Sequence, residues 1–266
     1  MIKLIATDMD GTFLDNQKQW DKQFIDQFYQ LKNKGIKFCI ASGNQYYRLF
    51  QKFLPMSPDM MFIADNGSVI ADGPNILYTN TIDPKDVESV KAILKEQPEI
   101  FAILSGRRAA YALNANIAYK NVVTMYYASN KFVESFDEID DEIIKIAIYD
   151  PNYTITKFYD AFASKLPDNL KVATSGNEWM DIQNKTINKG IAIQKVQELL
   201  QIKENECMAF GDQMNDYELL QSVKYSFAMQ NAIDPIKHIA YGVCPSNNNQ
   251  GVLMMIQDLL DVGDYE

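Results

Sequence analysis

The chain has 266 residues, of which 47% are hydrophobic and 23% charged. This is enough apolar material for a sizeable core, which excludes a disordered or fibrous protein, and the length allows one large domain or two smaller ones. The 25 basic residues against 35 acidic ones leave a net charge of −10, without the basic face that a nucleic-acid-binding protein needs. Because His238 is the only histidine, Ser-His-Asp hydrolysis and multi-histidine metal sites are nearly excluded.

The cysteines and the N-terminus indicate a compartment. Cys39, Cys207 and Cys244 lie far apart with no CxxC pair, which predicts buried free thiols in a reducing environment. The N-terminal segment reaches Asp8 too early for a secretory apolar region, and no apolar stretch approaches the ~20 residues of a membrane helix. We therefore expect a soluble, cytoplasmic protein without membrane contacts.

The first and last parts of the chain alternate between short apolar runs and segments of helical periodicity. The runs predict strands over 2–7, 36–41, 60–64, 207–210 and 225–228. The periodic segments predict helices over 21–34, 45–53, 189–200 and 216–223. Strands that are apolar throughout and separated by helices are typical of a parallel sheet covered on both faces, so we expect an α/β, doubly wound fold.

The middle of the chain, from about Thr81 to Asn184, has a different order of elements. Helices are predicted over 84–96, 117–126 and 155–166, and extended runs over 100–105, 140–149, 170–174 and 178–183. The acidic stretch 134–142 is interpreted as an ordinary solvated face. This mixture predicts an α+β insert, with residues 1–82 and 186–266 forming one domain and 83–185 the other.

Polar residues stand where the predicted strands of the first domain stop. Asp8 and Asp10 follow the first strand, Ser42-Gly43-Asn44 follow the second, and Gly211-Asp212 follow a late one. The carboxyl ends of parallel strands form one edge of a sheet, where ligands bind. We therefore expect segments some two hundred residues apart to converge on one site.

The segment Asp8–Leu14 contains the pattern DxDG, whose two carboxylates share a face of extended backbone. Taken alone, the DxDG pattern marks an exposed turn about as often as it marks a functional site. An EF-hand calcium loop is a second alternative, and it fails because the segment follows a buried strand and Gln19 takes the place of the bidentate Glu.

The late segment Gly211–Asp216 adds two more carboxylates, Asp212 and Asp216, and the amide of Asn215. Carboxylates gathered together repel, by about 4 kcal/mol for two charges ~4 Å apart at an effective dielectric constant of about 20. A divalent cation resolves this repulsion. Oxygen ligands without His or Cys favour Mg²⁺.

Two further segments favour the binding of an anion. Ser42-Gly43-Asn44 precedes a predicted helix, whose free N–H groups attract a phosphate, although a simple serine cap explains the same residues. Lys189 begins another predicted helix, where a cation opposes the dipole unless an anion lies nearby. By itself Lys189 would more often be a solvated surface lysine.

In order along the chain, DxDGT, SGN, NKG and GDxxND resemble the motifs of haloacid-dehalogenase-like phosphatases of the Cof-type (IIB) subfamily, over essentially the whole length. The segments Asp8–Leu14 and Ala41–Tyr47 are most similar to a bacterial sugar phosphatase of that subfamily. Two residues depart from commoner members: Asn44 replaces Arg, and Gln230 replaces Gly. The resemblance implies a Rossmann-like core and assigns the insert as a cap over the strand ends.

The resemblance also implies a role for each motif. Asp8 would be the nucleophile, giving an aspartyl-phosphate, and Asp10 the general acid and base. Magnesium would be held by Asp8, the Asp10 carbonyl and Asp212, with Asp216 acting indirectly or through water. The transferring phosphoryl group would be bound by Ser42, Gly43, Asn44, Lys189 and Asn215.

The leading hypothesis is therefore a Mg²⁺-dependent phosphomonoester hydrolase of sugar phosphates. A phosphoryl transferase such as a phosphomutase could use the same nucleophile. A non-catalytic sensor of a phosphorylated metabolite would have no need for both Asp8 and Asp10. In each case the partner is a small phosphorylated metabolite, with no nucleic acid or membrane, and the chain is expected to be a monomer or weak homo-oligomer.

Overall fold

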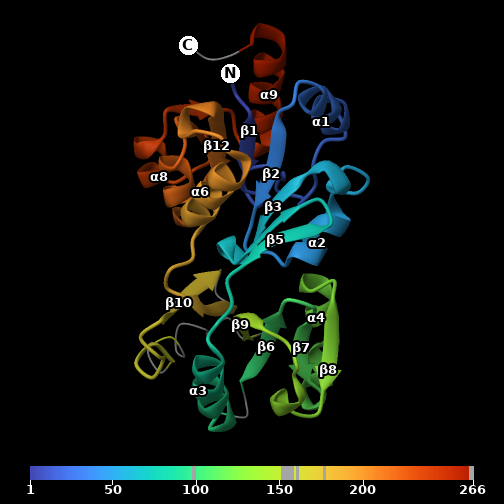
Figure 1. Ribbon diagram of the computed structural model, residues 1–266, viewed down its shortest axis with the longest axis vertical. Coiled ribbons are helices and arrows are strands. Elements are labelled where there is room, and N and C mark those ends of the chain that lie inside the picture. The colour runs from blue at the N-terminus through green and yellow to red at the C-terminus, as the bar shows by residue number, and fades with distance from the viewer. Residues whose placement is uncertain (98–99, 151–158, 160–161, 176–177, 264–266) are drawn as a thin grey trace. The chain divides into compact units, whose positions relative to one another are not determined.

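The computed structural model describes residues 1–97, 100–150, 159, 162–175 and 178–263. The chain divides into two compact units (Figure 1). Unit 1 consists of Met1–Tyr78 and Asn188–Glu266, and unit 2 of Thr79–Ile187. Each unit has a sheet of its own.

Within the described residues, unit 1 is built on an eight-stranded sheet of order β14-β13-β12-β1-β2-β3-β4-β5. The pairs from β14 to β3 are parallel, which confirms the predicted α/β, doubly wound fold. The sequence did not reveal that β4, next to the edge strand β5, runs antiparallel to β3. The strands are β1 (Leu4–Thr7), β2 (Lys37–Ala41), β3 (Met61–Ala64), β4 (Val69–Asp72), β5 (Asn75–Thr79), β12 (Cys207–Gly211), β13 (Tyr225–Met229) and β14 (Gly242–Cys244).

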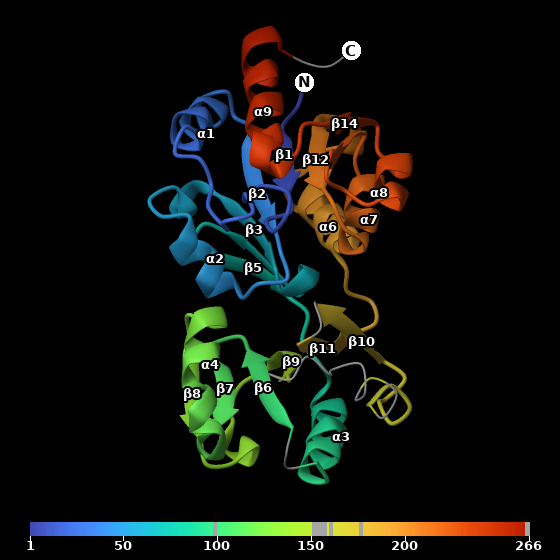
Figure 2. The same ribbon diagram turned by 180° about the vertical axis from the view of Figure 1, so that it is seen from behind.

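The helices of unit 1 lie on both faces of this sheet (Figures 1 and 2). All residues of β1, β3, β12 and β13 are buried, as strands covered on both faces require. Gln27 ties two of the helices together, because its Nε2 donates to the carbonyl of Leu253 at 3.0 Å. The helices are α1 (Phe24–Asn33), α2 (Tyr46–Lys52), α6 (Lys189–Leu200), α7 (Tyr217–Gln221), α8 (Asp234–Ile239) and α9 (Gly251–Val262).

Unit 2 contains a six-stranded sheet of order β10-β11-β9-β6-β7-β8 within the described residues. Its pairs are antiparallel, except that β7 and β8 run parallel. The strands are β6 (Phe101–Gly106), β7 (Ala110–Leu113), β8 (Asn130–Val133), β9 (Ile143–Tyr149), β10 (Leu170–Ser175) and β11 (Trp179–Asn184). Together with helices α3 (Pro84–Lys95) and α4 (Lys120–Tyr126), these strands make unit 2 an α+β structure.

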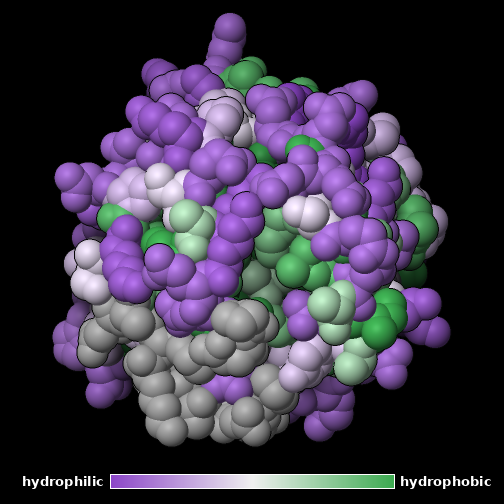
Figure 3. Space-filling view, turned by 90° about the horizontal axis from the view of Figure 1, so that it is seen from below, coloured by the Kyte–Doolittle hydropathy of each residue, from purple (hydrophilic) through white to green (hydrophobic). Residues whose placement is uncertain are grey.

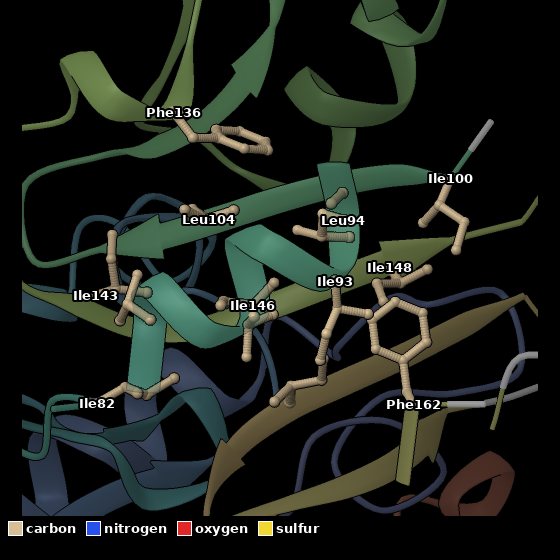
Figure 4. Packing of buried hydrophobic residues seen from close by; sticks show 14 of the residues in the cluster. Ile82, Ile93, Leu94, Ile100, Leu104, Phe136, Ile143, Ile146, Ile148 and Phe162 are labelled. Atoms are coloured by element: carbon tan, nitrogen blue, oxygen red, sulfur yellow. The ribbon is translucent and has the colours of Figure 1, made fainter. Parts of the chain in front are cut away.

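The main core of unit 2 lies between α3 and its sheet (Figure 4). Val90 and Leu94, one helical turn apart on α3, pack against Leu104 of β6 and Ile146 of β9. This apolar stripe explains why the predicted helix over 84–96 forms. Half of the helix predicted over 155–166 lies outside the described residues.

The acidic stretch 134–142 is largely a solvated face, as predicted, with one exception. Its acidic residues Glu134, Asp137, Glu138, Asp140 and Glu142 are exposed, whereas the side chain of Asp141 is only 3% exposed. Its Oδ2 accepts hydrogen bonds from the Tyr111 hydroxyl at 3.0 Å and from the Arg108 backbone N–H at 2.9 Å. Asp141 closes the turn between β6 and β7, a contact that residue type alone does not reveal.

The cysteines and the surface agree with the composition. All three cysteines are free and buried, as predicted, and burial raises the pKa of Cys207 to about 11 and of Cys244 to about 12.

In the part of the chain that the structure describes, no helix has the length and apolar character needed to cross a membrane. The face seen from below is largely hydrophilic, with smaller hydrophobic areas between (Figure 3).

Candidate active site

The candidate site is formed by residues that directly follow the parallel strands of unit 1. Asp8 comes after β1, Ser42 after β2, Asp65 after β3 and Asp212 after β12. Because these strands are parallel neighbours, their carboxyl ends share one edge of the sheet. The Asp8 N–H donates to the carbonyl of Phe210 at 3.0 Å, which joins the first motif to the last.

The loop after β1 can approach Asp212 only because it contains a glycine. Gly11 has φ +83°, which side-chain-bearing residues rarely adopt, and a Cβ there would lie 2.5 Å from Asp212 Oδ2. The next residue, Thr12, donates its hydroxyl to Asp212 Oδ1 at 2.8 Å. The DxDGT motif therefore holds the Asp212 carboxylate as well as supplying Asp8.

Lys189 lies between two carboxylates. Its Nζ donates to Asp8 Oδ1 at 2.5 Å and to Asp216 Oδ1 at 2.6 Å. The three residues are 1%, 6% and 0% exposed, for Lys189, Asp8 and Asp216 respectively. Lys189 is therefore not a solvated surface lysine, and the anions that offset the helix dipole at the start of α6 belong to the protein itself.

Asp216 organises the loop after β12. Its Oδ2 accepts hydrogen bonds from the backbone N–H groups of Asp212 at 3.0 Å and Gln213 at 3.2 Å. Its other oxygen accepts from Lys189, so both oxygens have donors within the protein. This arrangement suits a residue that orients the loop and the lysine. Asp212 likewise has a donor on each oxygen, from the Thr12 hydroxyl at 2.8 Å and from Gln213 Nε2 at 3.4 Å.

Burial controls the charges of this cluster. It raises the pKa of Asp8, with repulsion from Asp216 adding to the effect and Lys189 opposing it. Burial also raises the pKa of Asp212, against the hydrogen bond from Thr12. For Lys189, burial alone would lower the pKa, but attraction to Asp216 and Asp8 outweighs it and the net shift is upward. The site holds more negative than positive groups, which favours an added cation.

The donor set fits a hard divalent cation. One oxygen from each of Asp8, Asp212 and Asp216 lies within 4.8 Å of the others. Oxygen-only ligands of this kind suit Mg²⁺ better than a transition metal. The predicted ligand from Asp10 is its backbone carbonyl, and its carboxylate is otherwise engaged, because Oδ1 accepts a hydrogen bond from Lys18 Nζ at 2.8 Å.

The Ser42-Gly43-Asn44 loop lies beside Asp10. Asn44 Nδ2 is 3.0 Å from Ser42 Oγ and 3.4 Å from Asp10 Oδ2. A Cβ on Gly43 would stand 3.0 Å from Asn66 Oδ1, so this loop also touches the turn after β3. The second motif is thus brought to the first, as predicted from the strand order.

Asn215 occupies an exposed position in the short 3-10 turn Met214–Asp216, next to the buried Asp216. Of the predicted site residues, Asp8, Lys189, Asp212 and Asp216 are in or beside one buried cluster. The remaining predicted site residues lie on the loops that follow three strands: Asp10 after β1, Ser42, Gly43 and Asn44 after β2, and Asn215 after β12.

Sequence reasoning gave no role to several residues that shape the site. Asn231 donates to the Gly11 carbonyl at 2.8 Å and accepts from the Asn247 N–H at 3.0 Å, so it anchors the first loop to the C-terminal segments. Asn231 and Asn247 both bond backbone carbonyls of the first loop, those of Gly11 and Leu14, and residue type and spacing alone give no sign of these contacts.

The fold and the buried cluster agree with the comparison to known families. Residues 5–256 match the haloacid dehalogenase-like hydrolases, and the chain belongs to this family. The chain is a phosphatase of this superfamily, as the names of its relatives indicate.

Individual relatives span the whole chain. The 5-amino-6-(5-phospho-D-ribitylamino)uracil phosphatase YbjI of Escherichia coli is 34% identical over 262 residues, covering 97% of this chain and 96% of the relative. The phosphatase YwpJ of Bacillus subtilis is 26% identical over an alignment of 292 residues, which covers 97% of this chain and 100% of YwpJ. A solved structure from Streptococcus mutans is 29% identical with a TM-score of 0.83, covering 98% of this chain and 99% of the other.

Proposed function

We propose that this chain is a Mg²⁺-dependent phosphomonoester hydrolase that acts through an aspartyl-phosphate on phosphorylated sugars and polyols. The observation that carries the proposal is the buried contact of Lys189 with Asp8 and Asp216, beside Asp212. A lysine held charged next to a reactive carboxylate suits the binding of a dianionic phosphoryl group.

In the first step, the Asp8 carboxylate attacks phosphorus. The new Asp8 O–P bond forms as the bond from phosphorus to the leaving oxygen breaks, and Asp10 gives its proton to that oxygen. In the second step, water attacks the phosphorus of the acyl phosphate while Asp10 takes a proton from it. Inorganic phosphate and the free Asp8 carboxylate result, so one difficult displacement becomes two easier ones.

The phosphoryl oxygens would be bound by Lys189, which contacts Asp8, and by groups on the loops that follow β2 and β12. Lys189 supplies a buried positive charge, and Ser42, the Gly43 N–H and Asn215 supply hydrogen-bond donors. Asn44 belongs to the same predicted set, although its amide lies on Ser42 and Asp10. Donors arranged before the reaction lower the barrier because little reorganisation is needed as charge develops.

The metal would be held by Asp8 and Asp212, with the Asp10 carbonyl as a further predicted ligand and Asp216 acting indirectly. When bound, Mg²⁺ neutralises charge on the carboxylates and the phosphoryl group. The surplus of carboxylates over ammonium groups in the cluster supports the proposal of a bound cation.

The substrate class is proposed from two sources. The sequence resembles a sugar phosphatase, and the Escherichia coli relative is named for a substrate carrying a phosphorylated ribityl chain. In both, the phosphate is carried by a polyhydroxylated carbon chain. We therefore propose phosphates of pentoses, hexoses and pentitols, including ribityl compounds, as the class to test.

The test is phosphate release from a panel of hexose, pentose and pentitol phosphates, flavin mononucleotide and pyridoxal phosphate, with Mg²⁺ or with EDTA. Activity is expected with Mg²⁺ and to be lost with EDTA. Asp8→Asn should lose turnover by at least about 10³-fold, because the nucleophile is gone. Asp258→Asn, on the exposed face of α9, is the matched control and should keep it.

Three results separate the alternatives. A phosphorylated Asp8 in acid-quenched wild-type protein supports the covalent route. An isomeric phosphosugar in place of free phosphate would indicate a phosphoryl transferase. Metal binding with no turnover of any panel member would refute the proposed hydrolase.

A further inference from the structure

The carboxylate of Asp10 is held by a donor on each of its oxygens. Lys18 Nζ lies 2.8 Å from Oδ1, and Asn44 Nδ2 lies 3.4 Å from Oδ2. The Asp10 side chain is 44% exposed, so packing does little to fix its rotamer. These two contacts, one on each oxygen, orient it.

Arg48 fixes the direction of the Asn44 amide. Its Nη1 donates to Asn44 Oδ1 at 2.9 Å. Because a guanidinium has donors only, the atom that faces it must be the amide oxygen, which turns the Asn44 NH₂ group toward Ser42 and Asp10. The position where commoner subfamily members carry Arg is thus filled here by Asn, and an arginine one helical turn later acts through it.

Lys18 is presented by a tight turn with a positive φ of +62°. Asp15 organises this turn, since its Oδ1 accepts from the N–H groups of Gln17 at 2.9 Å and Gln19 at 2.8 Å. A lysine seldom adopts this conformation, and such strain persists where the surrounding structure enforces it. The turn is further tied to α2, because Lys52 Nζ donates to the Lys18 carbonyl at 3.1 Å.

Arg48 and Lys52 are four residues apart on α2 and therefore lie on the same face of that helix. One holds the Asn44 loop, and the other holds the Lys18 turn. The helix thus fixes both donors to Asp10 with respect to each other.

We propose that Lys18, Asn44 and Arg48 are positioning residues that hold the Asp10 carboxylate in line with the leaving oxygen of the substrate. This inference rests on the proposed function, in which Asp10 transfers the proton. Proton transfer needs hydrogen-bond reach and a defined direction, so a freely rotating carboxylate would be in place for only part of the time.

The test compares leaving groups. An alkoxide leaves slowly without a proton, whereas p-nitrophenolate leaves without one, so misplacing the general acid harms the first reaction selectively. We would measure kcat and KM for a sugar phosphate and for p-nitrophenyl phosphate in Lys18→Met and Arg48→Met. Asp10→Asn sets the full size of the leaving-group effect, and Lys22→Met, exposed and near in sequence, is the matched control.

In both variants, kcat for the sugar phosphate should fall about tenfold, a fraction of what a general acid contributes, while kcat/KM for p-nitrophenyl phosphate stays within about twofold. Lys18→Arg and Arg48→Lys should recover much of the loss, because each retains a donor. An equal fold-loss of activity on the sugar phosphate and on p-nitrophenyl phosphate, or no loss of activity on either, would overturn the inference.

Crystal structures of Lys18→Met and Arg48→Met test the same inference without an activity measurement. More than one Asp10 rotamer supports it, and an unchanged single rotamer in both variants overturns it. If the wild-type protein released phosphate from neither substrate, the proposed function would fail while this structural readout still decided the orientation of Asp10.

Discussion

Lys189 shows how one residue can be placed unfavourably by local rules and favourably by the tertiary structure. It is the first residue of α6, at the positive end of the helix dipole, and it is almost fully buried. Both features disfavour an ammonium group. The carboxylates of Asp8 and Asp216, contributed by other segments, compensate for both. The residues that stabilise the Lys189 charge are therefore the ones with which Lys189 is proposed to act.

Replacement of Lys189 by Met should lower the free energy of unfolding by about 3–5 kcal/mol, because Asp8 and Asp216 are left buried without their cation. Urea denaturation without metal measures this. Lys195→Met, at an exposed ion pair on the same helix, should change stability by about 0.5 kcal/mol or less.

Added Mg²⁺ should raise the unfolding midpoint of Lys189→Met more than that of the wild type, since it supplies the missing positive charge. Equal stability of the Lys189→Met and Lys195→Met proteins would contradict the importance given to the buried ion pair.

At the scale of elements, the site depends on how turns fit against the start of α6. Gly67, in the turn after β3, has φ +109°, and a Cβ there would lie 2.6 Å from the carbonyl oxygen of Asn188. Asn188 in turn caps α6, because its Oδ1 accepts from the Ile191 N–H at 2.7 Å. The turn after β3 therefore sets the position of the first residues of α6, including Lys189.

Gly67→Ala should destabilise the protein by about 2–4 kcal/mol, combining an unfavourable φ with a backbone clash. Gly35→Ala is the matched control, since Gly35 has φ +75° but a Cβ at this position would meet nothing within 4 Å. It should cost about 1 kcal/mol, from conformation alone. Thermal unfolding of both variants measures the difference, and equal costs would mean that the contact with Asn188 is unimportant.

At the scale of the whole molecule, the insert is a unit with a core of its own, made by α3 and the sheet of unit 2. The two ends of the insert are held together by a hydrogen bond, in which Asn184 Nδ2 donates to the carbonyl of Thr81 at 2.9 Å. Neighbouring ends allow a segment to be inserted into another domain without straining it. We propose that the insert is a separately folding domain, close to the predicted 83–185.

A fragment of residues 79–187 should therefore fold by itself and unfold cooperatively on heating, as followed by circular dichroism. Ile146→Asp in the same fragment should abolish the transition, because it buries a charge among the packed side chains. A fragment without a cooperative transition would show that the insert needs unit 1 to fold.

Much of the local structure could be read from the chain because it depends on near neighbours. The helix predicted over 189–200 is α6, Lys189–Leu200, since Asn188 caps it and its apolar spacing is regular. The antiparallel β4, between β3 and the edge strand β5, was not predicted. Val69–Asp72 is too short to show a period, and its partner is chosen by the position of β3.

The sequence by itself determined the α/β class, the motif residues and the strand ends on which they stand, because these follow from periodicity and residue type. Only the tertiary structure decided that Lys189 lies between Asp8 and Asp216, and that Arg48 acts on Asp10 through Asn44. Such contacts join loops from different strands. Their distances depend on which strands are neighbours and how tightly glycines let the loops approach, and no local pattern in the chain encodes either.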